Sequence, residues 1–229
     1  MATDFTNKVI TITGGASGIG LATANLLHAR GATLSICDAS QEALDALDFP
    51  QENFLAYKCD VRDFSQVQSW IQETLSKFGQ INGAANFAGV LGAHPWEDTV
   101  ESTSLEDWDR IIGIDLTGIF NTLKSLLPHL APSSSIVNAT SLVAHRAVPG
   151  AAAYTASKHG VIGLTRSCAK DYTHKGIRVN AVAPGWVGTN MYGALSAGRE
   201  EVVEAAVKGE GLGRVAEPEE VARVLRVNP

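Results

Sequence analysis

Short runs of apolar and β-branched residues alternate with stretches of helical periodicity along the whole chain, and this alternation constrains the fold most. Strand, helix and strand repeated in this way predict right-handed crossovers and a parallel sheet with helices on both faces. The length of 229 residues fits one domain, spanning residues 1–229. The expected strands are residues 9–13, 33–37, 54–59, 81–87, 135–138 and 177–182.

Helical patterns fill the intervals between these strands, after the glycine-rich turn that follows residue 13 and in residues 43–47, from Ser65 onward, in 105–127 and in 154–172. Two stretches, residues 90–103 and 185–213, are expected to be loops because they are rich in Gly, Ala and aromatic residues. Loops on a sheet of this kind tend to carry the substrate contacts.

Charge and targeting features exclude several classes of partner. The formal net charge of -6, with no Lys/Arg cluster, argues against a nucleic-acid or anionic-membrane surface and favours a small-molecule substrate. The first eight residues lack the features of a signal peptide, and no apolar stretch is long enough to span a bilayer. Cys37, Cys59 and Cys168 have unrelated spacings, which predicts reduced packing residues in a cytoplasmic protein rather than disulfides or a zinc site.

The turn Thr13-Gly14-Gly15-Ala16-Ser17-Gly18-Ile19-Gly20 joins the first strand to a helix. Its glycines, spaced G-x-x-x-G-x-G, permit a tight turn and let backbone N–H groups at the helix N-terminus approach a pyrophosphate. The alternative is that three glycines only shape a turn. The second strand ends at Asp38, whose carboxylate would accept hydrogen bonds from ribose hydroxyls and repel a 2'-phosphate. This favours NAD over NADP, although Asp38 could instead cap the following turn.

Tyr154 and Lys158 are four residues apart on an expected helix and therefore project from one face. An ammonium beside a phenol favours the phenolate, so Lys158 is expected to lower the pKa of Tyr154. A tyrosine tuned in this way could donate and accept protons, whereas the alternative is an exposed pair on a helix surface.

Several motifs in a fixed order make the chain resemble the classical short-chain dehydrogenases/reductases from about Lys8 to Val224. The motifs are Thr13 to Gly20, Asp60-Val61, Asn86-Phe87-Ala88-Gly89, Ser141, Tyr154 with Lys158, and Pro184-Gly185. The resemblance implies an α/β fold, a Rossmann-type doubly wound parallel sheet in a single domain. It also implies an NAD-dependent oxidoreductase that interconverts a secondary alcohol and a ketone, with no metal in the reaction.

The resemblance also implies residue roles. Tyr154 would be the general acid/base, Lys158 would lower its pKa and bind the nicotinamide ribose, and Ser141 would hydrogen-bond the substrate oxygen. The cofactor would be held by Gly14, Ser17, Gly18, Ile19, Gly20, Asp38, Asp60, Val61, Asn86, Ala88, Gly89, Tyr154, Lys158, Pro184, Gly185, Val187 and Thr189.

Three departures from the family pattern stand out. Phe87 replaces an asparagine and is expected to change packing under the adenosine. Asp115 replaces the asparagine of the catalytic set and is expected to change the pH dependence of proton transfer, or only to tie the backbone of its helix. The chain stops at Pro229, so the usual seventh, edge strand is expected to be missing. The family's homo-oligomer, a dimer or tetramer, would thereby lose part of its interface.

The candidate substrate residues give a largely apolar wall that suits a hydrophobic, cyclic molecule. They are Trp96, Val143, His145, Trp186, Met191 and Tyr192. His145 and the neighbouring Arg146 could equally be turn residues that face solvent. Two other functions remain open: an isomerase or cyclase on the same fold, and a cofactor-binding protein with reduced turnover.

Overall fold

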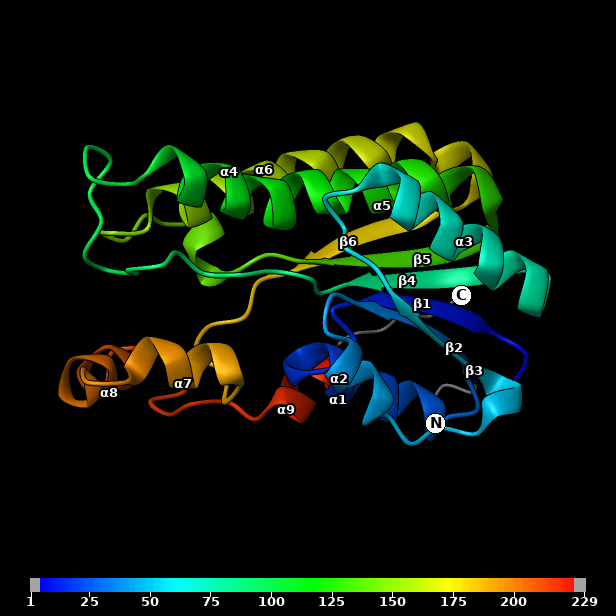
Figure 1. Ribbon diagram of the computed structural model, residues 1–229, viewed down its shortest axis with the longest axis horizontal. Helices are drawn as coiled ribbons and strands as arrows, with labels where there is room; N and C mark the ends of the chain where they lie inside the picture. The colour runs from blue at the N-terminus through cyan, green and yellow to red at the C-terminus, as the bar shows by residue number, and fades with distance from the viewer. Residues whose placement is uncertain (1–4, 225–229) are drawn as a thin grey trace.

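A computed structural model describes residues 5–224, which form a six-stranded, wholly parallel sheet in the order β3-β2-β1-β4-β5-β6 (Figure 1). This confirms the expected fold. The order reverses direction between β1 and β4, which is the crevice where ligands bind in open α/β sheets. The strands are β1 (Val9–Thr13), β2 (Thr33–Asp38), β3 (Phe54–Lys58), β4 (Ile81–Asn86), β5 (Leu130–Ala139) and β6 (Arg178–Val182).

Helices cover both faces of the sheet, with α3, α4, α5 and α6 above it and α1, α2 and α9 below it in Figure 1. They are α1 (Gly18–His28), α2 (Gln41–Asp45), α3 (Phe64–Phe78), α4 (Leu105–Ile112), α5 (Gly118–Leu126), α6 (Ala152–Asp171), α7 (Asn190–Ser196), α8 (Glu200–Lys208) and α9 (Pro218–Val224). Short 3₁₀ turns lie at Gln51–Asn53, Leu127–His129, Leu142–Ala144 and Thr173–Lys175.

Helix α3 shows how local sequence sets an element's limits. Asp63 accepts a hydrogen bond from the Ser65 backbone N–H at 2.8 Å, and this cap starts the helix one residue before Ser65. Gly79 ends it in the left-handed region at φ 76°. Between these ends, Trp70 and Ile71 are fully buried against the sheet.

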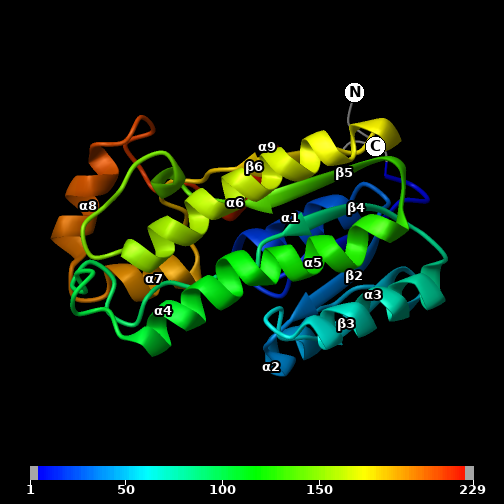
Figure 2. The same cartoon turned by 90° about the horizontal axis from the view of Figure 1, so that it is seen from above.

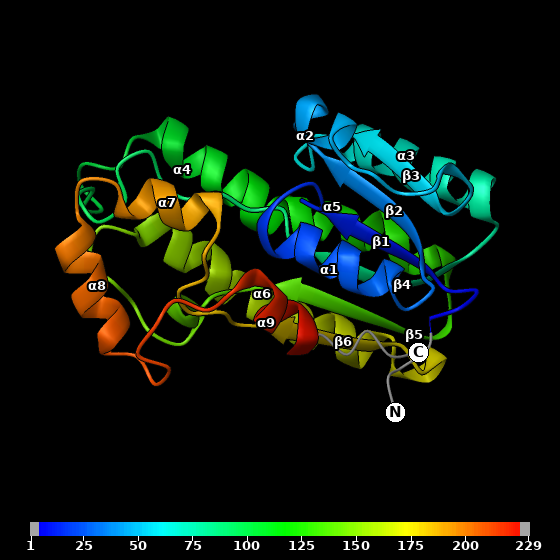
Figure 3. The same ribbon diagram turned by 90° about the horizontal axis from the view of Figure 1, so that it is seen from below.

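The helical pattern expected over residues 105–127 is confirmed as a continuous helical stretch, within which a π-helical turn, Gly113–Thr117, lies between α4 and α5. One expectation about the elements is wrong. The expected loop over residues 185–213 contains α7 and α8, which lie together at one end of the molecule in Figure 3. The stretch 90–103, in contrast, holds no helix or strand.

Strand β6 lies at the edge of the sheet, and no seventh strand lies beside it within residues 5–224. The chain end at Val227-Asn228-Pro229 lies outside the described residues. Helix α9 packs against α1 on the lower face. None of the helices in the described range is long and apolar enough to cross a membrane.

Candidate active site

The turn between β1 and α1 is built so closely that side chains are excluded from it. Gly14 has φ +63°, and a Cβ there would lie 2.7 Å from the Ala88 backbone nitrogen. A Cβ on Gly20 would lie 2.1 Å from the Gly14 carbonyl oxygen. Ser17 caps α1 without a side-chain hydrogen bond, and the first helical turn contains no acidic residue. The N–H groups at this helix end therefore suit an anion such as a pyrophosphate.

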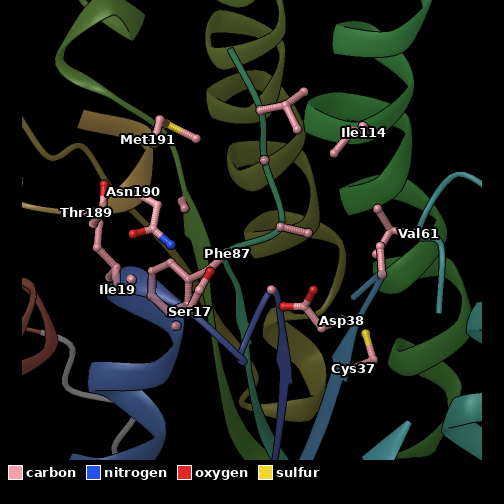
Figure 4. A pocket seen from close by; sticks show the side chains of 18 of the residues that line it. Ser17, Ile19, Cys37, Asp38, Val61, Phe87, Ile114, Thr189, Asn190 and Met191 are labelled. Carbon is pink, nitrogen blue, oxygen red and sulfur yellow. The ribbon is translucent and has the colours of Figure 1, made fainter. Parts of the chain in front are cut away.

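A groove of about 350 Å³ runs from this turn across the carboxyl ends of the strands. Figure 4 shows Asp38, Cys37 and Val61 at one end of it and Thr189, Asn190 and Met191 at the other. Fourteen of the predicted cofactor residues line it: Gly14, Ser17, Gly18, Ile19, Gly20, Asp38, Asp60, Val61, Ala88, Gly89, Tyr154, Lys158, Pro184 and Thr189. These residues fit an extended dinucleotide.

The acidic end of the groove contains two carboxylates with different partners. Asp38 accepts hydrogen bonds from the backbone N–H groups of Ala16 at 3.2 Å and Ser40 at 3.1 Å. It therefore both caps the following turn and braces the glycine-rich turn. Asp60 forms a bidentate ion pair with Arg62, and these hydrogen bonds hold the pKa of Asp60 below its usual range. Sequence reasoning missed Arg62, whose side chain also lines the groove.

Three predicted cofactor residues lie elsewhere. Asn86 is buried and donates to Asn138 Oδ1 at 2.7 Å, so it joins β4 to β5 in the core. Gly185 and Val187 line the adjoining substrate cavity instead of the groove. The main signal for Asn86 was its motif, which does not show on which side of a strand a residue projects.

Other side chains that were not predicted as cofactor ligands also line the groove, among them Phe87, Cys37 and Cys59. The Phe87 ring lies beside Ser17 and Ile19 in Figure 4, away from Asp38 and Val61. The expected change in packing under the adenosine stays a prediction. Cys37 and Cys59, free and buried as expected of packing residues, border the acidic end.

Lys158 and Asp115 form a buried pair beside the half-buried Tyr154, where α6 faces the π-helical turn. Lys158 Nζ lies 3.0 Å from Asp115 Oδ2, and both side chains are almost fully buried. Asp115 Oδ1 accepts a hydrogen bond from the Val90 backbone N–H at 2.8 Å. Gly89 leaves room for this pair, since a Cβ there would lie 3.3 Å from Lys158 Nζ. Asp115 thus joins α6 to the segment that follows β4 and does more than tie its own helix.

Burial disfavours the charged forms of both Asp115 and Lys158. Burial raises the pKa of Asp115, although Lys158 lowers it. Burial also disfavours the charge on Lys158, but Asp115 and Tyr154 outweigh it and raise the pKa of Lys158. The Lys158–Asp115 ion pair therefore places two charges beside the Tyr154 phenol, and both act on the pKa of that phenol.

The pKa of Tyr154 lies above its usual value, because burial outweighs the attraction of Lys158 and because Asp115 adds repulsion. Lys158 Nζ is 5.3 Å from the Tyr154 ring centroid, and its effect has the expected sign. The expected net lowering is nevertheless wrong for the described structure. Sequence spacing shows the ammonium but not the loss of solvent around the phenol.

A second cavity, of about 160 Å³, adjoins the groove at Tyr154. Ser141 lines it, and this serine also caps the 3₁₀ turn Leu142–Ala144. A hydrogen bond with Ser141 lowers the pKa of Tyr154. Two hydroxyl groups therefore lie together at the junction of the cavities, where they could bind one substrate oxygen.

Most predicted substrate residues line this cavity: Trp96, Val143, Trp186, Met191 and Tyr192. Trp186 stands between Trp96 and Tyr192, with ring centroids 6.1 Å and 6.3 Å away. His145 is exposed and does not line the cavity, which favours the alternative of a turn residue that faces solvent. Arg146, left open between pocket and solvent, does line it. Leu195 was missed because it lies on α7, within a stretch expected to be a loop.

The chain is similar to known proteins in sequence and in fold. The family model described as Enoyl-(Acyl carrier protein) reductase matches residues 14–227. Short-chain dehydrogenase/reductase aba4 of Botryotinia fuckeliana is 45% identical over 195 residues, covering 82% of this chain and 74% of the relative. Meso-2,3-butanediol dehydrogenase of Serratia marcescens is 38% identical over 224 residues, covering 96% and 86%.

Among solved structures, that of levodione reductase matches with a TM-score of 0.88 and 34% identity, covering 96% of this chain and 89% of that chain. The ordered motifs, the sheet order and these relatives lead to one conclusion. The chain belongs to the classical short-chain dehydrogenase/reductase family of oxidoreductases.

Proposed function

We propose that the protein is an NAD(H)-dependent oxidoreductase that interconverts a secondary alcohol and a ketone on a hydrophobic, cyclic small molecule. The observation that carries this proposal is the position of Tyr154, which lines both the cofactor groove and the substrate cavity. Two of the relatives, meso-2,3-butanediol dehydrogenase and levodione reductase, are named for an alcohol and a dione.

The groove residues would hold a nicotinamide dinucleotide, which when bound would supply or accept the hydride. In reduction, the Tyr154 hydroxyl donates its proton to the carbonyl oxygen, and Ser141 donates a hydrogen bond to the same atom. In oxidation, the Tyr154 phenolate accepts the hydroxyl proton. The Lys158 ammonium, held by Asp115 at 3.0 Å, stabilises that phenolate.

The preference for NAD rests on Asp38. Its carboxylate stands at the end of β2, where an adenosine ribose lies in folds of this class. It would accept hydrogen bonds from ribose hydroxyls and repel a 2'-phosphate. Arg62 is the nearby cation that could favour NADP, but its guanidinium is engaged by Asp60 in two parallel hydrogen bonds.

The proposal extends to assembly and location. Trp108 on α4 and Phe120 on α5 are 39% and 47% exposed, and such large apolar side chains support a homo-oligomer, a dimer or tetramer, joined through these helices. The three free cysteines support a cytoplasmic location. The net charge of -6 supports a small-molecule partner and neither nucleic acid nor membrane.

The test is a spectrophotometric assay with NAD or NADP and a panel of cyclic and acyclic secondary alcohols and their ketones. We expect turnover with NAD on the cyclic members. Tyr154→Phe is expected to reduce kcat/KM by about 10²- to 10⁴-fold, as loss of a general acid/base does, and to retain NADH binding. Tyr57→Phe removes the same atom from β3, outside both cavities, and serves as the matched control.

The alternatives give different results in the same experiment. Product formation without net change in the cofactor would identify an isomerase or cyclase. Cofactor binding without turnover of any panel member would identify a cofactor-binding protein. A Tyr154→Phe variant as active as wild type would refute the assigned role of this tyrosine.

A further inference from the structure

Arg146 is the charged group at the substrate cavity. Among the described residues that line this cavity, it alone carries a full charge, and its neighbours in the wall are mostly apolar. It lies five residues beyond Ser141, on the segment that joins the 3₁₀ turn Leu142–Ala144 to α6. The same segment therefore contributes a hydroxyl to the reacting end of the cavity and a cation to its wall.

The partner of Arg146 is a carboxylate that can be replaced. Arg146 Nη2 pairs with Glu210 Oε1, from the segment that follows α8. Figure 2 shows α8 at the same end of the molecule as the yellow-green segment between β5 and α6, and the ion pair links that segment to the residues that follow α8. The two side chains are 53% and 30% exposed, and a pair so open to solvent contributes little to stability. Exchange of one carboxylate for another at this guanidinium therefore costs little.

Arg199, in the same region, is an arginine with a structural role and serves as a comparison. Its guanidinium donates to the Pro95 carbonyl oxygen at 3.0 Å and pairs with Glu97, so it ties α8 to the segment 90–103. It does not line the cavity. Arg146 differs in two respects within the described residues: it borders the cavity, and its guanidinium pairs with a side chain, Glu210, without a hydrogen bond to a backbone carbonyl.

We propose that the substrate carries a carboxylate away from its reacting carbon, and that Arg146 binds this carboxylate in exchange for Glu210. The proposal rests on the proposed alcohol and ketone chemistry and narrows its substrate to hydroxy acids and keto acids with an apolar, cyclic body. Arginine suits this task because its planar fork can hold a carboxylate with two hydrogen bonds. The apolar wall excludes water from the rest of the molecule.

Binding can be measured without turnover. Trp96 and Trp186 line the cavity, so tryptophan fluorescence is expected to report ligand entry. The protein with bound NAD is titrated with cyclohexanecarboxylate and with cyclohexanecarboxamide, which has the same shape and no charge. We expect the acid to bind about tenfold more tightly, the scale of a charge-assisted hydrogen bond at a partly exposed site. Arg146→Gln is expected to remove this preference and leave amide binding unchanged.

The exchange of Glu210 for the substrate carboxylate also predicts a variant with increased affinity for the acid. Glu210→Gln removes the competing carboxylate and is expected to tighten acid binding several-fold. Glu204→Gln makes the same change in charge on α8, where Glu204 pairs with Lys208 away from the cavity, and is expected to have no effect. Equal strengthening by both variants would show a general effect of net charge and would overturn the exchange.

Turnover is the independent second test. 4-Hydroxycyclohexanecarboxylate and its methyl ester are compared by kcat/KM, and the acid is expected to be preferred about tenfold in wild type but not in Arg146→Gln. If the acid binds but is not turned over, the result would support the carboxylate site and count against the proposed oxidoreductase chemistry. Equal or undetectable binding of the acid relative to the amide in wild type would overturn the carboxylate site, whatever the turnover.

Discussion

The buried carboxylate of Asp115 gives the sharpest prediction about the chemistry. The Asp115→Asn variant loses the negative charge but keeps an oxygen that can accept the hydrogen bond from the Val90 N–H. In the wild-type structure this hydrogen bond is 2.8 Å long. Asp115 raises the pKa of Tyr154, so its loss is expected to lower that pKa. Alcohol oxidation needs the phenolate, and the rising limb of kcat/KM against pH therefore moves to lower pH.

The size of the effect follows from two distances. Lys158 Nζ lies 3.0 Å from Asp115 Oδ2 and 5.3 Å from the Tyr154 ring centroid, so the carboxylate is within about 8 Å of the ring. At an effective dielectric constant of about 20, unit charges at that separation interact by about 2 kcal/mol. A displacement of the limb by at least about one pH unit is the result expected from an interaction of this size.

The assay is the pH profile of kcat/KM for oxidation of one alcohol at saturating NAD. Asp109→Asn, on the exposed face of α4, makes the same charge change and should leave the profile in place. Asp115→Ala, which also loses the bond to Val90, separates charge from positioning. A profile of Asp115→Asn that stays in place, or moves to higher pH, would refute the electrostatic reasoning.

Three further outcomes are expected from the geometry. Asp38→Ser should raise the kcat/KM ratio of NADP to NAD about tenfold or more, measured by initial rates, because it removes the carboxylate expected to repel a 2'-phosphate. Gly20→Ala, whose Cβ would lie 2.1 Å from the Gly14 carbonyl oxygen, should lower stability by about 1–3 kcal/mol or more in denaturant unfolding and weaken NADH binding. Gly163→Ala within α6, where a Cβ meets nothing within 4 Å, should instead stabilise the protein by about 0.5–1 kcal/mol. An unaltered cofactor ratio, or glycine variants that change stability in the opposite order, would contradict these assignments.

The sheet could be predicted because its strands are short apolar runs that can be recognised from the local sequence. Val9–Thr13 is a run of five buried residues between a polar start and a glycine turn, and β2 has four buried residues at its centre. Helices α7 and α8 left a weaker signal. Each has about two turns, and Val203 and Val207 are the buried pair that marks the inner side of α8. Two apolar positions four apart are too few to distinguish a short helix from an apolar loop.

Side-chain direction set a second limit on prediction. Asn86 and Phe87 are neighbours in one motif, yet Asn86 joins Asn138 in the core and Phe87 lines the cofactor groove. His145 and Arg146 are likewise adjacent, but only the arginine of these two borders the substrate cavity. Successive residues of extended or turning chain point to different sides, and the motif alone does not say which side faces the ligand.

The π-helical turn Gly113–Thr117 shows why the most consequential feature was hidden. Hydrophobic periodicity continues through residues 105–127, because Ile111 before the turn and Ile119 and Leu123 after it are all buried. One extra residue in a helical turn changes the direction of a side chain without interrupting such a pattern, and turns of this kind occur often at functional sites. Here the turn contains Asp115, which faces Lys158 at 3.0 Å. The substitution was visible in the sequence, but the backbone irregularity that accompanies its direct contact with the lysine was not.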